Sequence, residues 1–212
     1  MATHHYIIMA DIISSRDIAK GEDFMGQFKS LTHLANEQFK GQIVSPLTIT
    51  LGDEFQGIVD STQTLFELVF FLEEQRLEAG YTFQLRYSLV YGEIETEINT
   101  EIAYEMYGTG LTQAREGLQR AKDSGHHYYV DLQLEPEVQL QLCLELYQSI
   151  KSEWKPREYA IVAAFLKHKD YKDLERIGLY KTRSGAWKKG KSLRIDEYHT
   201  IKRLIFLILK DG

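Results

Sequence analysis

The stretch 47-LTITLGDEFQGIV-59 decides the fold. On both sides of Gly52-Asp53 the residues alternate in polarity and include β-branched and aromatic side chains, which is typical of two strands joined by a tight turn. Glycine in the first position suits a two-residue hairpin turn, so the pattern predicts strands over 45–51 and 54–59. Asp53 and Glu54 would then lie at the tip of the hairpin.

The segments around this hairpin alternate between strand and helix patterns. A nearly continuous apolar run at 5–13 predicts a central strand covered on both faces, and an apolar stripe from 23 to 39 predicts a helix. Further patterns predict a helix over 60–77, a strand over 81–92, a half-exposed strand or ribbon over 93–105, a helix over 111–122 and a strand over 127–132. The order is βαββαβ with additions. It predicts an α+β fold with a ferredoxin-like, palm-type antiparallel sheet that has its helices on one face.

The rest of the chain is predicted to be helical. After this first domain (1–133) we expect a connecting helix over 134–153 and a small all-α domain over 154–212, which Pro156 opens at a first helical position. Three short helices with a basic third one predict a helix-turn-helix-like unit. Its expected DNA-binding residues are Arg183, Trp187, Lys188, Lys189 and Lys191. Small three-helix units are common, so a structural or protein-docking role is the alternative.

Charge divides the chain in the same way. Residues 1–150 hold 9 of the 25 Lys and Arg residues and 23 of the 31 Asp and Glu residues, a net charge of −14. Residues 151–212 hold the other 16 basic and 8 acidic residues, a net charge of +8. This asymmetry predicts two units with different partners, the basic one suited to nucleic acid. In the alternative interpretation the acidic and basic units face each other.

Composition indicates a globular cytoplasmic protein. With 212 residues, 43% of them hydrophobic, the chain can bury an ordinary core. The single cysteine, Cys143, excludes an intramolecular disulfide and makes a cysteine-based metal site a poor expectation. No stretch approaches the ~20 apolar residues that a membrane-spanning helix needs, and we expect neither export nor membrane insertion.

Two acidic residues are candidate metal ligands. Asp11 ends the first strand and Asp53 tips the hairpin, so in a palm sheet they converge at one edge. Mg²⁺ takes one or two carboxylates together with water and phosphate oxygens. Glu54 is the candidate to orient the metal or accept a proton. The loop after the first strand supplies the expected triphosphate ligands Ser14, Ser15 and Arg16. The alternative is an ordinary hairpin and an ordinary helix cap.

Three motifs resemble one superfamily. The segment 50-TLGDEFQG-57 is similar to the signature of the GGDEF and class III nucleotide cyclase superfamily, with Leu51 in place of the first glycine. The segment 10-ADIISSRD-17 resembles its first-strand motif, and 114-AREGLQRAKDSGHHYYV-130 resembles its late helix and strand. The whole chain resembles the SatD family, whose members pair such a domain with a C-terminal helical segment.

The resemblance implies a purine nucleoside triphosphate as ligand, Mg²⁺ or Mn²⁺ as cofactor, and a homodimer. The metal residues that it implies are Asp11, Ile12 and Asp53; the catalytic residue is Glu54; the nucleotide-binding residues are Ser14, Ser15, Arg16 and Lys122. Two departures matter: the first argues against synthesis of c-di-GMP, and the second removes or displaces the pair that stabilises the transition state. Ala19-Lys20 stand where the guanine-reading Asn-Asp pair of diguanylate cyclases begins. Thr112 and Glu116 stand where class III cyclases place Asn and Arg, with Arg115 one position early.

Loss of one such transition-state donor typically lowers the rate by ~10²–10³-fold. We therefore expect a cytoplasmic regulatory protein with a divergent, Mg²⁺-dependent nucleotide-binding domain coupled to a DNA-binding tail. One alternative is an active nucleotide cyclase or nucleotidyltransferase. The other is a non-catalytic DNA-binding or scaffold protein whose acidic site is vestigial.

Overall fold

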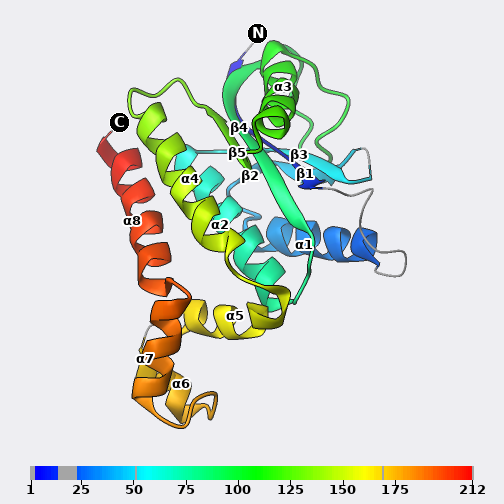
Figure 1. Ribbon diagram of the computed structural model, residues 1–212. Helices are drawn as coiled ribbons and strands as arrows, with labels where there is room; N and C mark the ends of the chain where they lie inside the picture. The colour runs from blue at the N-terminus through cyan, green and yellow to red at the C-terminus, as the bar shows by residue number, and fades with distance from the viewer. Residues whose placement is uncertain (1–2, 14–22, 51, 169, 212) are drawn as a thin grey trace.

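The computed structural model describes residues 3–13, 23–50, 52–168 and 170–211. One five-stranded sheet lies at the centre of the first part of the chain, in the order β2-β3-β1-β4-β5 (Figure 1). Its strands are β1 (Thr3–Ile13), β2 (Ile43–Ile49), β3 (Glu54–Val59), β4 (Gln84–Ile94) and β5 (Tyr128–Asp131). The first four are antiparallel as predicted, whereas β5 runs parallel to β4, so the sheet is mixed.

The middle strand β1 is apolar on both faces. Ile8 and Ala10 point toward α1 (Phe24–Gln38) and α2 (Thr62–Glu78), whereas Ile7 and Met9 point toward α3 (Thr109–Ser124). Successive side chains of a strand alternate between faces, so a continuous apolar run needs cover on both. The prediction that the helices lie on one face is therefore wrong: α3 covers the face opposite to α1 and α2 (Figure 1).

Close backbone contact between α3 and the sheet depends on glycine. A Cβ on Gly110 would lie 2.6 Å from the carbonyl carbon of Gly92 in β4, and a Cβ on Gly117 would lie 2.3 Å from Ser88 Oγ. Real Cβ atoms do not come this close to their neighbours. The glycines thus let α3 lie directly on the sheet, and α3 carries Arg115 toward the strand ends.

The β2–β3 hairpin has a longer turn than predicted. The strand β2 ends at Ile49, and the last bond between the strands joins Thr50 N to the Glu54 carbonyl at 2.9 Å. Four residues, 50–53, therefore lie between the two strands, and Gly52 takes the left-handed conformation with φ of 87°. Asp53 directly precedes β3, near the end of β1.

Residues 93–105 do not form the predicted ribbon, because β4 ends at Ile94. The chain beyond it folds back over β2 and β3 and bonds to their side chains instead of to another strand. Thr48 Oγ1 accepts from Ala103 N at 2.8 Å, and Gln56 Nε2 donates to the Ala103 carbonyl. This segment covers the outer part of the β2–β3 face that α3 leaves open.

The helices of the C-terminal part lie close to their predicted positions. They are α4 (Glu137–Ser152), a 3₁₀ turn over Pro156–Glu158, α5 (Tyr159–Lys167), α6 (Tyr171–Arg176), α7 (Arg183–Ser192) and α8 (Ile195–Asp211). Gly185 is in the first turn of α7, where its N–H donates to Oγ1 of the N-cap residue Thr182 at 3.1 Å. The glycine therefore does not weaken a helix interior.

These helices pack into the same core as α1, α2 and one face of the sheet. The Phe70 ring of α2 contacts Tyr147 of α4 and Phe206 of α8, with centroids 5.2 and 5.7 Å apart. Trp154 Nε1 donates to the Leu193 carbonyl at 2.8 Å. The helices α4 and α8 lie side by side along α2, while α6 and α7 project from the lower end of the molecule (Figure 1). None of the described helices has the length and apolar character that a membrane crossing requires.

Candidate functional site

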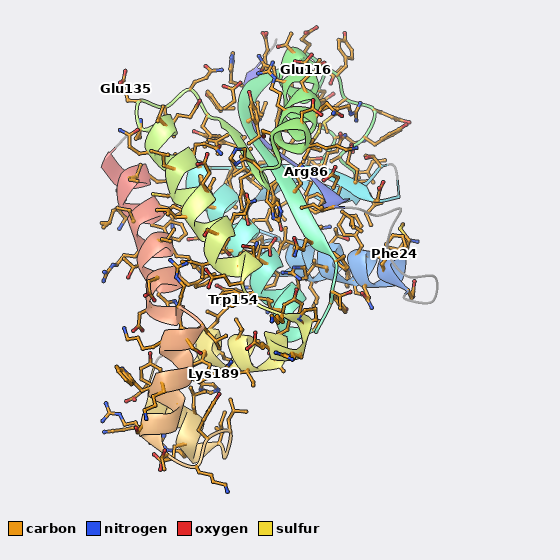
Figure 2. The ribbon with its side chains drawn as sticks, viewed as in Figure 1. Phe24, Arg86, Glu116, Glu135, Trp154 and Lys189 are labelled. Carbon is orange, nitrogen blue, oxygen red and sulfur yellow. The ribbon has the colours of Figure 1, made fainter. Side chains whose placement is uncertain are left out.

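Three charged side chains stand in one row across the sheet. Asp11 on β1 is paired in register with Glu54 on β3 and with Arg86 on β4. Side chains at directly paired positions project from the same face, here the one that α3 covers. Figure 2 shows Arg86 on β4 in the middle of the molecule. In this row the Asp11 carboxylate has the acid Glu54 on one side and the basic residue Arg86 on the other.

Arg86 is bonded to both oxygens of Asp11. Its Nη1 lies 2.9 Å from Oδ2 and 3.1 Å from Oδ1, and the two side chains are 9% and 24% exposed. Burial raises the pKa of Asp11 above its usual range; the guanidinium of Arg86 opposes that rise, and the charges of Asp53 and Glu54 add to it. Asp11 is thus a partly buried carboxylate near other carboxylates, with the Arg86 guanidinium beside it.

Glu54 has a different basic partner. Arg115 of α3 approaches Glu54 Oε1 with its Nη2 at 3.5 Å, and Thr50 Oγ1 lies 3.4 Å from the same oxygen. The Arg115 side chain is 60% exposed, so it can move to a ligand at little cost. Arg115 reaches the acidic row although it stands one position before the expected cyclase arginine.

A cleft of about 390 Å³ opens beside Glu54, between the 95–108 segment and α3. It is lined by Thr50, Gln56, Tyr104, Glu105, Met106, Tyr107, Gly108, Leu111, Thr112 and Arg115. Tyr104 and Tyr107 are exposed, and Glu105 holds a left-handed backbone with φ of 59°, which is unusual for a residue other than glycine. The cleft has the size of a small-molecule site and both polar and aromatic walls.

Sequence reasoning missed Gln56, Arg86 and Glu105. For Arg86 a signal was present, because it is a charged residue in the otherwise apolar strand segment 85-LRYSLV-90. Charged side chains in buried strands are rarely left without a partner. No local pattern marks Gln56 or Glu105, which become neighbours of the site only through the course of the 95–108 segment.

The carboxylates of Asp11 and Asp53 are of the ligand type that binds divalent cations such as Mg²⁺. Ile12 N donates to the Asp53 carbonyl at 2.9 Å, which fixes the hairpin against the end of β1. The Ile12 side chain is a hydrocarbon without a donor atom, so only its backbone carbonyl could serve as a ligand. Within the described residues, no three His, Cys, Asp or Glu side chains are arranged to hold a metal ion together. Two carboxylates completed by phosphate and water are a set that Mg²⁺ accepts, but Arg86 already contacts both Asp11 oxygens.

The other nucleotide-binding candidates are not brought to this row. Ser14, Ser15 and Arg16 lie outside the described residues. Lys122 is exposed in the last turn of α3, about two helical turns beyond Arg115, and its side chain forms no hydrogen bond or ion pair with the described part of the chain. Their roles remain predictions from the motif resemblance.

The DNA-binding candidates on α7 fall into two groups. Arg183, Trp187 and Lys188 are exposed, and the Trp187 ring is 48% accessible. Lys189 and Lys191 are engaged, with Glu158 at 2.6 Å and with Asp196 at 2.8 Å. Lys189 lies far from Arg86, toward the other end of the molecule (Figure 2).

The helix-turn-helix arrangement remains a prediction. Six residues, 177–182, connect α6 to α7, more than the three or four of a typical helix-turn-helix turn.

Solved structures similar to this chain are nucleotide cyclase domains. A bacterial light-regulated adenylyl cyclase is 10% identical with a TM-score of 0.47, over 61% of this chain and 43% of that one. The guanylate cyclase domain of RhGC from Catenaria anguillulae, solved with GTP, is 14% identical with a TM-score of 0.37, over 55% and 72% of the two chains. The guanylyl cyclase Cya2 is 9% identical with a TM-score of 0.38, over 57% and 71%. The chain thus spans less than half the length of the light-regulated enzyme.

The comparison by sequence is more specific. No curated protein matches the chain. The model of the SatD family matches residues 5–178, a range that runs from β1 through α6. Because this match covers the greater part of the chain, the protein belongs to the SatD family.

Proposed function

We propose that this protein binds a purine nucleoside triphosphate, together with Mg²⁺ or Mn²⁺, on the α3 face of its sheet. The observation that supports this most is the row of Asp11, Glu54 and Arg86 in register on three strands, beside the Asp53 hairpin. Such a row offers carboxylates to a divalent cation and a guanidinium to phosphate within a few ångströms of each other. A polyphosphate with a bound divalent cation would present a positive charge to the carboxylates and negative charges to the guanidinium.

Each group would have a separate role. Asp11 and Asp53, with the backbone carbonyl of Ile12, would hold the cation, which when bound neutralises phosphate charge. Arg86 and Arg115 would contact phosphate oxygens, for which the guanidinium fork is suited. The motif resemblance adds Ser14, Ser15, Arg16 and Lys122 as further phosphate ligands.

The cleft beside Glu54 is the proposed site of the base. Tyr104 and Tyr107 offer exposed rings for stacking, and the Glu105 carboxylate can accept hydrogen bonds from ring or exocyclic N–H groups. The choice of a purine rests on the motif resemblance, because the lining itself does not distinguish bases by size.

Binding is better supported than turnover. Glu54, the candidate base, is bonded to Arg115, and Thr112 and Glu116 replace the Asn and Arg that the cyclase pattern requires. The active cyclase or nucleotidyltransferase is the second candidate, and the observation in its favour is that Arg115 reaches the acidic row in spite of its shifted position.

A thermal-shift panel tests the proposal. The wild type, Asp11→Ala and Asp53→Ala would be melted with each nucleoside triphosphate and Mg²⁺ or Mn²⁺. Ligand at 100 times its Kd stabilises by about 2.7 kcal/mol, which for a chain of this size raises the Tm by roughly 5–10 °C. Both variants should lose that rise. Asp123→Ala, an exposed acid elsewhere on α3, is the matched control and should retain it.

If no nucleotide raises the Tm of the wild type, the site is vestigial and the scaffold alternative is favoured. Analysis of the nucleotides after incubation separates binding from turnover, because only the enzyme alternative produces pyrophosphate.

The basic tail supports a second function, contact with DNA under the control of the nucleotide. Its specific support is the exposed group of Arg183, Trp187 and Lys188 on α7. We further propose a cytoplasmic setting, in keeping with one buried cysteine, Cys143. The homodimer that the motif resemblance implies is to be measured by sedimentation of the intact chain.

A further inference from the structure

Arg86 occupies the carboxylate that the proposed site needs for its cation. A single nitrogen, Nη1, contacts both Asp11 oxygens, at 2.9 and 3.1 Å. A divalent cation needs a lone pair of the same oxygens. The carboxylate has lone pairs for both, but a divalent cation bound there would lie against the positive charge of the Arg86 guanidinium, so cation and guanidinium compete for Asp11 electrostatically.

The ion pair is incomplete on the arginine side. Arg86 Nε is buried and has no hydrogen-bond partner among the described residues. A guanidinium that serves only to neutralise a buried carboxylate is expected to use its fork, with two parallel bonds from two nitrogens. Arg86 instead uses Nη1 for both bonds and leaves Nε without a partner among the described residues, on the same face of the sheet as the acidic row.

We propose that Arg86 is a built-in counter-ion that competes with a divalent cation for Asp11, so that the site excludes a free cation and accepts one that arrives with a polyphosphate. This inference rests on the proposed function for the identity of the ligand. Arg86 thereby makes the binding of cation and nucleotide mutually dependent.

The charges explain the direction of this coupling. A free cation at Asp11 would displace a 9%-exposed guanidinium, leaving its positive charge buried beside a second one. A polyphosphate that enters with the cation provides new oxygens for Arg86, so the displaced charge is paired again. Without Arg86, the charged groups that act on Asp11 within the described part of the chain are the acids Asp53 and Glu54, which favours any cation.

Manganese binding without nucleotide is the direct test. Free Mn²⁺ would be titrated by electron paramagnetic resonance against the wild type, Arg86→Met and Arg86→Gln. An opposite charge beside a carboxylate changes its proton affinity by about one to three log units, so Mn²⁺ affinity should rise at least about tenfold in both variants. Arg86→Gln keeps a polar side chain on the strand and serves if the methionine variant fails to fold.

Two further variants make the result specific. Asp11→Asn combined with Arg86→Met should lose the gain, because the gain acts through Asp11. Arg120→Met removes the same charge from α3 away from the acidic row, where it pairs with Glu116, and should change Mn²⁺ affinity less than about threefold.

Addition of a non-hydrolysable purine triphosphate measures the coupling itself. It should increase Mn²⁺ affinity strongly in the wild type and much less in Arg86→Met. Unchanged or weaker Mn²⁺ binding by both Arg86 variants overturns the inference, as does a gain that survives Asp11→Asn. The Mn²⁺ titration without nucleotide tests the role of Arg86 whether or not any nucleotide binds. The thermal-shift panel tests nucleotide binding separately, so the two failures can be told apart.

Discussion

Lys151 of α4 donates to Glu73 Oε2 of α2 at 2.5 Å, in the interior of the protein. Arg76 Nη2 lies 3.3 Å from the same oxygen, so one buried carboxylate holds two buried cations. The Arg76 guanidinium also lies over the Tyr159 ring of α5, 5.2 Å from its centroid. The helix α2 is therefore joined to α4 through Glu73 and to α5 through Arg76.

We predict that Glu73→Gln destabilises the protein by about 3–5 kcal/mol, because it leaves Lys151 and Arg76 buried without a counter-charge. Lys151→Met should be milder, since Arg76 still neutralises Glu73. Urea unfolding measures both changes. Glu78→Gln is the control: its ion pair with Lys167 is exposed and contributes at most about 1 kcal/mol. A Glu73 variant as stable as the control would contradict the prediction.

The stability of the protein should fall in mild acid because of His127. Burial and, after it, the nearby charge of Lys151 lower the pKa of His127 to about 4. In the unfolded chain the pKa is about 6.5, so between pH 6.5 and pH 4 the unfolded state binds the proton and the folded state does not. Stability is therefore complete above pH 6.5 and decreases toward pH 4, by at most about 3 kcal/mol.

The measurement is the free energy of unfolding of the wild type and of His127→Gln at several pH values. Other carboxyl groups titrate in the same range, so the quantity of interest is the difference between the two proteins. That difference should change across pH 6.5 to 4 and be flat above it. Parallel curves for the two proteins would show that His127 does not contribute.

Gly110→Ala tests whether α3 must lie directly on the sheet. Alanine is favoured over glycine in helices by about 1 kcal/mol, which on its own would stabilise the protein. A Cβ at this position would overlap the backbone of Gly92, and such overpacking costs about 1–3 kcal/mol. We expect a net loss of stability in thermal and urea unfolding. Gly41→Ala, whose Cβ meets no atom within 4 Å, should show no loss.

The fold was largely predictable because most of its patterns are local. The alternation around Gly52, the apolar run of β1 and the apolar stripe of α1 each depend on a few neighbouring residues. The side of the sheet on which α3 lies is not local. The apolar run through Ile7 and Met9 already indicated that helices must cover both faces of the sheet. The predicted ferredoxin-like arrangement, with its helices on one face, did not meet that requirement.

The site was predictable in part. Asp11, Asp53 and Glu54 stand next to turns, where an acidic residue is visible in the sequence, although their roles as ligands and base remain predictions. Arg86 is 75 residues from Asp11 and becomes its partner only through the register of β1 with β4. Register is set by the packing of both sheet faces and is not visible in either strand alone. For this reason the basic half of the row was missed.

DNA binding by the tail should depend on the exposed residues of α7. Each phosphate contact contributes about −0.9 to the slope of log affinity against log salt concentration. We therefore predict that Arg183→Ala and Lys188→Ala each weaken binding to a random-sequence duplex and each reduce this slope by about 1. Lys189→Ala should change the slope less, because Lys189 is paired with Glu158 at 2.6 Å. That substitution should instead lower the stability of the protein.

Fluorescence anisotropy at a series of salt concentrations measures these slopes, and the same series with a nucleoside triphosphate and Mg²⁺ tests the control of the tail by the nucleotide. The three lysine and arginine variants carry the same change of charge, so a uniform electrostatic effect would lower all three slopes equally. A smaller change for Lys189→Ala would place the contact at the exposed positions of α7. Wild-type binding that does not vary with salt would exclude a phosphate-contacting surface, and the basic charge of residues 151–212 would then serve its ion pairs with the rest of the chain.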